Sequence, residues 1–167
     1  MGVFTWHNGE PPKKMKVTQV YGIVFDKYGR TLMRIERDGD KKNYSLAGGT
    51  PEAYDADRIA TLRREMIEEV NTTLKKDIYV VGYMEVNEPS GIPPYAQLRM
   101  TTLIDKIGKA QPDPDGGETY ERLLTSPEKA IKLLNWGKEG EQMIMAAVKV
   151  AKEKFNLQPA SKPDEYV

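Results

Sequence analysis

The 167-residue chain contains no cysteine. This absence excludes disulfides, thiolate nucleophiles and cysteine-based zinc sites. No apolar run approaches the length of a transmembrane helix, and the N-terminus lacks the hydrophobic segment of a secretory signal. We therefore expect a cytoplasmic protein that has no membrane partner.

The chain also lacks net charge, because 25 lysines and arginines balance 25 aspartates and glutamates. A neutral chain argues against general nucleic-acid binding, although a local basic groove is still allowed. Its length and its 39% hydrophobic residues suit one soluble globular domain. We expect residues 17–157 to form that domain, preceded by a polar, partly mobile lead at 1–16 and followed by a polar, mobile tail at 158–167.

The distribution of β-branched and aromatic residues predicts a sheet interrupted by helices. One helix carries apolar residues at helical spacing from Ile59 to Val70 and is expected to end near Asn71. A second begins at Ser126, and a third covers residues 142–155. This order of elements fits an α/β/α sandwich with a central mixed sheet. The expected strands are residues 17–25, 31–37, 78–85, 97–106 and 119–124.

The first helix carries three carboxylates on one face. Glu65, Glu68 and Glu69 are three and four residues apart, so they project together. Carboxylate oxygens suit Mg²⁺ or Mn²⁺, while the simpler alternative is a solvated acidic face. Gly48 and Gly49 precede the helix and permit the close backbone approach that a metal or ligand loop requires.

Residues 48–72 resemble the signature of the Nudix hydrolases. In that pattern a Gly, five residues, a Glu and seven more residues lead to Arg-Glu-apolar-x-Glu-Glu-x-Gly-apolar. The helix half matches in order, but the interval from Gly49 to Arg64 is one residue longer than in the family. Ala56 therefore stands where the family has a glutamate that braces the arginine, and Asn71 replaces the final Gly. Asp55 or Asp57 could supply the brace, and either could cap the helix. The matching residues are Arg64, Glu65, Met66, Glu68 and Glu69.

The resemblance implies a Nudix-type sandwich and metal-dependent hydrolysis of a phosphoric anhydride. It implies that Glu65, Glu68 and Glu69 bind the metal and take part in catalysis, that Gly48 adds a carbonyl oxygen to the metal, and that Arg64 orients the glutamates. Family members often add an acidic residue from a late loop. Glu118 is favoured for that role here; the other candidates are Asp113, Asp115 and Glu121.

The loops give weaker indications of the substrate. Pro89-Ser90-Gly91 is a permuted version of a motif in Nudix enzymes that act on ADP-ribose, so Pro89 is a candidate substrate contact. Tyr95 could stack on a base or ribose, or pack on its own loop. Arg99 could pair with a phosphate, or lie at an exposed edge.

An ADP-ribose-like nucleoside diphosphate is therefore the favoured substrate. Nucleoside triphosphates, dinucleoside polyphosphates and RNA caps are alternatives within the enzyme class. The longer interval before Arg64 also allows a catalytically idle module that binds a nucleotide. The resemblance is compatible with a homodimer, because enzymes of the ADP-ribose type are often dimers.

Overall fold

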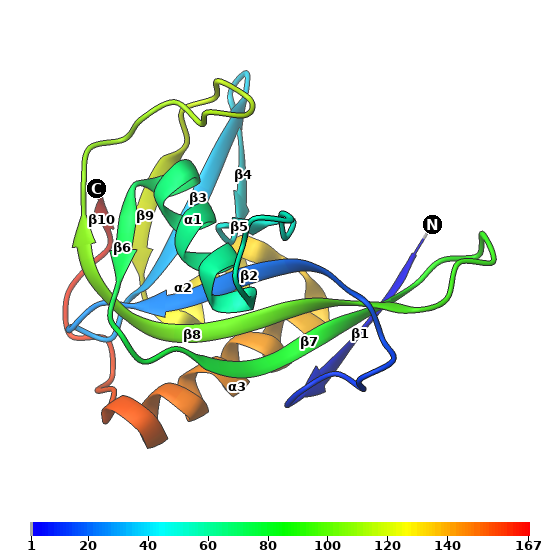
Figure 1. The fold of residues 1–167 in the computed structure, drawn as a ribbon. Helices are drawn as coiled ribbons and strands as arrows, with labels where there is room; N and C mark the ends of the chain where they lie inside the picture. The colour runs from blue at the N-terminus through cyan, green and yellow to red at the C-terminus, as the bar shows by residue number, and fades with distance from the viewer. Residues whose placement is uncertain (1) are drawn as a thin grey trace.

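A computed structural model describes residues 2–167 as a mixed sheet with helices on both faces (Figure 1). The strand order is β1-β7-β8-β2-β3-β9-β10, and three shorter strands, β4 (Lys41–Ser45), β5 (Gly48–Gly49) and β6 (Thr72–Leu74), pair with β3, β2 and β8. The longer strands are β1 (Val3–Asn8), β2 (Val17–Phe25), β3 (Thr31–Asp38), β7 (Tyr79–Asn87), β8 (Tyr95–Ile107), β9 (Glu121–Thr125) and the two-residue β10 (Glu165–Tyr166).

The sheet is mixed because β2 and β8 run parallel at its centre, whereas the other neighbours of β2 and β8 are antiparallel to them. The parallel register places Tyr21 beside Arg99. On the other side of β2, Tyr21 pairs with Gly48 of β5. The predicted α/β sandwich with a central mixed sheet is confirmed, and β2 links the glycine pair to the middle of the sheet.

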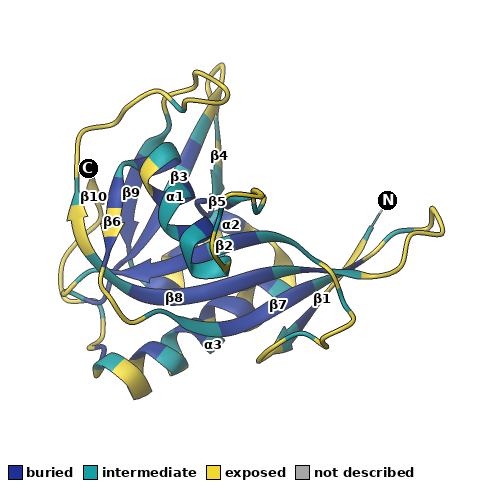
Figure 2. Ribbon diagram, viewed as in Figure 1, coloured by how far each residue is buried: buried dark blue, intermediate teal, exposed yellow. Residues whose placement is uncertain are grey.

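Alternation along β2 creates two separate cores. Ile23 and Phe25 face α2 (Pro127–Leu134) and α3 (Gly137–Phe155), while Val20 and Val24 face α1 (Arg58–Val70). Figure 2 shows the central strands β2, β7 and β8 mostly in dark blue, which marks buried residues. Within residues 2–167, no helix combines the length and apolar character needed to span a membrane.

The ends of α1 are set by two residues of the Nudix-like stretch. Asp57 caps the N-terminus by accepting a hydrogen bond from the Ala60 amide at 2.8 Å. Asn71 ends the helix with φ 45°, in the left-handed conformation that Gly or Asn adopts most readily. The replacement of the usual Gly by Asn71 therefore leaves the helix end intact.

The terminal segments differ from the sequence expectation. Residues 3–8 of the lead form β1, which pairs with β7 and buries Trp6, so the expected mobile lead is wrong there. The tail at 158–167 also lies against the domain: Arg30 donates to the Pro163 carbonyl at 2.7 Å, and β10 pairs with β9. Both segments are short and polar, and their order comes from pairing with distant strands.

Candidate functional site

A bidentate ion pair holds Arg64 on α1. Its Nε and Nη2 donate to the two carboxylate oxygens of Asp55, each at 3.0 Å. Asp55 also accepts from the Glu52 amide at 2.9 Å and the Thr61 hydroxyl at 2.8 Å. The hydrogen bonds from Arg64 hold the pKa of Asp55 well below its usual range. Asp55 thus braces the arginine and Asp57 caps the helix, which separates two roles that the sequence left open.

Arg64 in turn holds two of the three glutamates. Its Nη1 donates to Glu65 at 2.9 Å and to Glu68 at 3.1 Å, while Nη2 also reaches the Thr50 carbonyl at 3.0 Å. Charge-assisted hydrogen bonds of this kind fix both distance and direction. A single guanidinium therefore sets the positions of Glu65 and Glu68 relative to the loop ahead of α1.

The third glutamate, Glu69, is buried and held from the opposite side. The Gly48 amide donates to its Oε1 at 2.8 Å, and Arg34 of β3 donates to its Oε2. Arg34 is itself fixed by Ser45 at 3.0 Å and lies 4.4 Å from the centroid of the Tyr120 ring. Burial raises the pKa of Glu69, so the cationic Arg34 helps to keep its carboxylate ionised.

The two glycines are required by close contacts. A Cβ on Gly48 would lie 2.1 Å from the Val20 carbonyl oxygen, and a Cβ on Gly49 would lie 2.5 Å from the Glu65 carboxylate. Only glycine lets the backbone approach this closely. Burial raises the pKa of Glu65 to about 7, and a nearby cation would restore preference for the ionised form.

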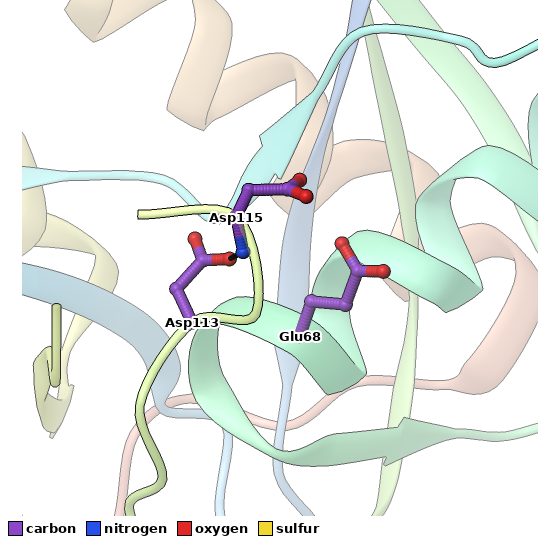
Figure 3. A group of neighbouring side chains, drawn as sticks. All are labelled: Glu68, Asp113 and Asp115. Carbon is purple, nitrogen blue, oxygen red and sulfur yellow. Dashed lines mark hydrogen bonds between the residues drawn. The ribbon is translucent and has the colours of Figure 1, made fainter. Parts of the chain in front are cut away.

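A late loop brings two further carboxylates to α1. Oxygens of Glu68, Asp113 and Asp115 lie within 4.8 Å of one another, and Figure 3 shows the two aspartates on the loop facing Glu68 on the helix. A 3.0 Å hydrogen bond from the Asp115 amide to the Asp113 carboxylate stabilises the turn of this loop. It is tied to α1 by the Asn71 side chain, which donates to the Lys109 carbonyl at 2.8 Å.

Glu118, favoured from the sequence, is not part of that carboxylate cluster among the described residues. Its carbonyl accepts from the Asp113 amide at 2.7 Å, and its side chain lies at Tyr120. Burial, with a smaller contribution from Glu118, raises the pKa of Tyr120 to about 12. Sequence alone offered no reason to prefer Asp113 or Asp115, because the turn that presents them depends on contacts within the loop.

The carboxylates at this end of α1 fit a divalent cation. All the side-chain donors are oxygens, as Mg²⁺ and Mn²⁺ prefer. Glu65 and Glu69 lie outside the tightest group; Arg64 contacts Glu65, and Arg34 and the Gly48 amide contact Glu69. Gly49 leaves room for the Glu65 carboxylate, which a Cβ at that position would meet at 2.5 Å. The residues present are thus suited to a metal, with Glu68 nearest to the extra acidic loop.

A cavity of about 600 Å³ lies next to these carboxylates, on the face of the sheet that α3 covers. This volume is in the range of small-molecule sites. Arg34 joins the two regions because it contacts Glu69 and also lines the cavity. Residues that define its walls include Phe4, Tyr21, Arg34, Arg99, Trp136 and Glu139.

The three substrate residues suggested by the sequence lie in different places. Arg99 lines the cavity and is only 3% exposed, so the expected position at an exposed edge is wrong. A contact with a phosphate stays a prediction. Pro89 is exposed beyond the end of β7, and Tyr95 is half-buried at the start of β8; neither lines the cavity. Sequence reasoning missed Trp136 and Glu139, because only folding brings the start of α3 to the sheet.

No family model and no curated protein matches the sequence. Solved structures do match. A mutant of the pyrophosphohydrolase RppH from Bacillus subtilis is 18% identical with a TM-score of 0.64, and covers 94% of each chain. A Nudix hydrolase from Nitrosomonas europaea is 16% identical with a TM-score of 0.58, covering 80% of this chain and 88% of its own. A structure of MutT, from a study of the Aliivibrio salmonicida and Vibrio cholerae proteins, is 14% identical with a TM-score of 0.57, covering 81% and 98%. The chain therefore has the fold of the Nudix hydrolases.

Proposed function

We propose that this protein is a Mg²⁺-dependent Nudix hydrolase that cleaves the diphosphate of a nucleoside diphosphate linked to another moiety. The observation that carries the proposal is the braced set of carboxylates on α1, with Arg64 held by Asp55 and in contact with Glu65 and Glu68. The adjoining cavity, reached through Arg34, supplies a place for the rest of a nucleotide.

Glu65, Glu68 and Glu69 would hold Mg²⁺ or Mn²⁺, together with the Gly48 carbonyl as the family resemblance implies. Asp113 and Asp115 add negative charge beside Glu68. A bound Mg²⁺ neutralises charge on the phosphates and lowers the pKa of a coordinated water. Two arginines and the Gly48 amide already fix the glutamates, so little reorganisation of the side chains is needed.

The chain's own groups position the reactants and move the proton. Water attacks phosphorus, the bond from phosphorus to the bridging oxygen breaks, and the proton of the water passes to a carboxylate. One of the three glutamates, or Glu118, serves as that base. Arg34 contacts Glu69 and also lines the cavity, so its guanidinium is placed to donate to a phosphate as well.

The sequence favours an ADP-ribose-like substrate, and its support is the permuted Pro89-Ser90-Gly91 motif. That loop joins β7 to β8 and is exposed. Nucleoside triphosphates, dinucleoside polyphosphates and RNA caps are the alternatives. The idle nucleotide-binding module was suggested by the longer interval before Arg64, but Asp55 supplies the brace across that interval. This contact favours the enzyme.

A substrate panel tests the proposal. The purified protein is incubated with Mg²⁺ or Mn²⁺ and each nucleotide class, and the products are separated to identify the broken P–O bond. We expect a nucleoside monophosphate from at least one diphosphate-linked substrate. Nucleotide binding without cleavage of any compound in the panel would instead establish the idle module.

We also propose a cytoplasmic location and a homodimer. Both rest on the sequence expectation and the family resemblance. Cell fractionation tests the location, and light scattering of the purified chain tests the assembly. A membrane-bound pool or a monomer at micromolar concentration would contradict these two proposals without affecting the hydrolytic one.

A further inference from the structure

Arg99 is a buried cation without an anionic partner. It is 3% exposed, and no carboxylate among residues 2–167 forms an ion pair with it. Its Nε donates to the Met143 sulfur at 3.3 Å, a weak acceptor, and its Nη1 to the Gln97 carbonyl at 3.2 Å. Burial lowers the pKa of Arg99 to about 10, so the guanidinium is charged at neutral pH. Such an arginine is costly to the apo protein.

The remaining nitrogen of Arg99 is open to the cavity. Nη2 donates to no described residue. Nη2 is not sealed from solvent, because Thr101 Oγ1 is the one side-chain polar atom among the described residues that is both sealed and without a partner. The guanidinium lies near two aromatic rings, 4.6 Å from the Tyr21 centroid and 5.9 Å from that of Trp136. Arg99 thus lines the cavity with its position fixed by Nε and Nη1 and with one nitrogen, Nη2, that lacks an acceptor.

Glu139 of α3 lines the same cavity with the opposite charge. Its Oε2 accepts from the Trp6 amide, which fixes the carboxylate, while its Oε1 has no partner in the described chain. Arg99 and Glu139 do not pair with each other, so the cavity presents a donor and an acceptor that are separated. A simple anion would be attracted by one and repelled by the other.

The aromatic walls favour a flat ligand between these charges. Phe4 and Trp136 line the cavity and are 49% and 39% exposed, so both present ring surface that no other residue covers. Stacking on such rings accepts any nucleobase. The base is therefore chosen by the polar groups at its edges.

We propose that the cavity binds guanine, with Arg99 donating to O6 and N7 and Glu139 accepting from N1–H and the N2 amine. This rests on the proposed function in one respect, because it takes the cavity to be the base site of a nucleotide. Guanine carries two adjacent acceptors and two adjacent donors, which match the arginine fork and the carboxylate. Adenine places an amine at position 6 and an acceptor at N1, so it opposes both groups. A guanine-containing diphosphate therefore replaces the ADP-ribose that the Pro89-Ser90-Gly91 motif favours. Arg99 and Glu139 are then specificity-determining residues.

Binding of nucleoside monophosphates tests the base site separately from hydrolysis, because they contain no anhydride bond. Calorimetry with Mg²⁺ should give GMP at least about tenfold tighter binding than AMP. IMP, which lacks the N2 amine, and 7-deaza-GMP, which lacks N7, should each bind more weakly than GMP. Equal or tighter binding of AMP would overturn the proposal.

Two variants separate recognition from a structural role. Arg99→Met should weaken GMP binding by at least about tenfold, yet raise the melting temperature, because it removes a buried unpaired charge. Glu139→Gln keeps an oxygen for the Trp6 amide. This variant should bind GMP no more tightly than the wild-type protein binds IMP. If Arg99→Met fails to fold, the Glu139 comparison still decides. Unchanged GMP binding in either folded variant would contradict the assignment.

The two proposals fail in different ways. Preferential GMP binding without cleavage in the substrate panel would refute the hydrolase and leave the base site standing. Cleavage of ADP-ribose with tighter binding of AMP than GMP would refute guanine recognition and leave the hydrolase standing.

Discussion

Opposite charges meet in the carboxylate region of α1 but stay apart in the cavity beneath α3. Arg64 forms ion pairs with Asp55, Glu65 and Glu68. Arg34 forms an ion pair with Glu69. Arg99 and Glu139 line one cavity without contact. The two regions therefore differ in whether their charged side chains pair with one another.

Paired charges keep their geometry whether or not a ligand is present, which suits groups that hold a reaction centre in place. Unpaired charges destabilise the empty site and favour a ligand that supplies the missing partners. If the two proposals hold, the carboxylate region carries the chemistry and the cavity chooses the substrate. Changes confined to the first region test this separation.

Removing divalent metal should have the largest effect. Chelation with EDTA should reduce hydrolysis by more than the roughly 10²–10³-fold that one fixed electrostatic donor contributes. The carboxylates on α1 would then lack the cation that compensates their charge. A nucleotide hydrolysis assay before and after chelation measures the loss, and added Mg²⁺ or Mn²⁺ should restore the rate. Full activity in EDTA would contradict a metal-dependent mechanism.

Disrupting the brace should have the next effect. Asp55→Asn removes the charge that holds Arg64 and should lower activity by about 10–100-fold, as loss of a supporting contact commonly does. Asp57→Asn is the matched control, because Asn is an equally good helix cap. Equal activities of the two variants would show that Asp55 is not a brace.

The brace also predicts a pH dependence of stability. Arg64 lowers the pKa of Asp55 in the folded protein. The ion pair therefore makes its full contribution to folding stability above the unfolded-state pKa of about 4, and this contribution is lost as the pH falls from there toward the lower folded-state pKa. The difference in melting temperature between wild type and Asp55→Asn should be constant above about pH 5 and shrink in acid. A difference that persists unchanged at low pH would point to a role other than ion pairing.

The late loop should have a smaller effect, on metal affinity. The Asp113→Asn and Asp115→Asn double variant should weaken Mg²⁺ binding by about tenfold, because both carboxylates approach Glu68. Glu118→Gln is the control for metal binding, and calorimetric Mg²⁺ titration compares the two. A larger loss of Mg²⁺ affinity in the Glu118 variant would assign the role of the late acidic residue to Glu118, as the sequence favoured.

The helix cap should have the smallest effect on function. Asp57→Ala should lower the free energy of unfolding by about 1 kcal/mol, since one amide at the start of α1 loses its partner. Hydrolysis under conditions where the variant is folded should stay near wild type. Denaturant unfolding and an activity assay together measure this; a large loss of turnover would assign Asp57 to the site.

The parts that the sequence predicted well are those with a local signal. The helix from Arg58 to Val70 follows from its spacing of apolar residues, and the match to the Nudix pattern around Arg64 anticipated the fold. The division of roles between Asp55 and Asp57 could not be predicted, because two aspartates flank Ala56 and either could have braced Arg64 or capped the helix. Only their distances to Arg64 and Ala60 distinguish them.

The cavity was harder to predict because its parts are distant in sequence. Phe4 comes from a strand that was expected to be a mobile lead, and Glu139 from a stretch expected to precede α3. Arg99 was recognised as a candidate, but its burial depends on Tyr21, Met143 and Trp136 around it. Long-range packing, which no local pattern encodes, assembles the site that would choose the substrate.

The central claim is that the carboxylates of α1 carry the chemistry. The most direct measurement compares hydrolysis by Glu69→Gln and by Glu153→Gln, an exposed control on α3, with Mg²⁺ saturating. The glutamine side chain would keep an oxygen for the Gly48 amide, so we expect a folded protein whose turnover is lower by about 10²–10⁴-fold, while the control is unchanged. Wild-type turnover by a folded Glu69→Gln protein would contradict the account.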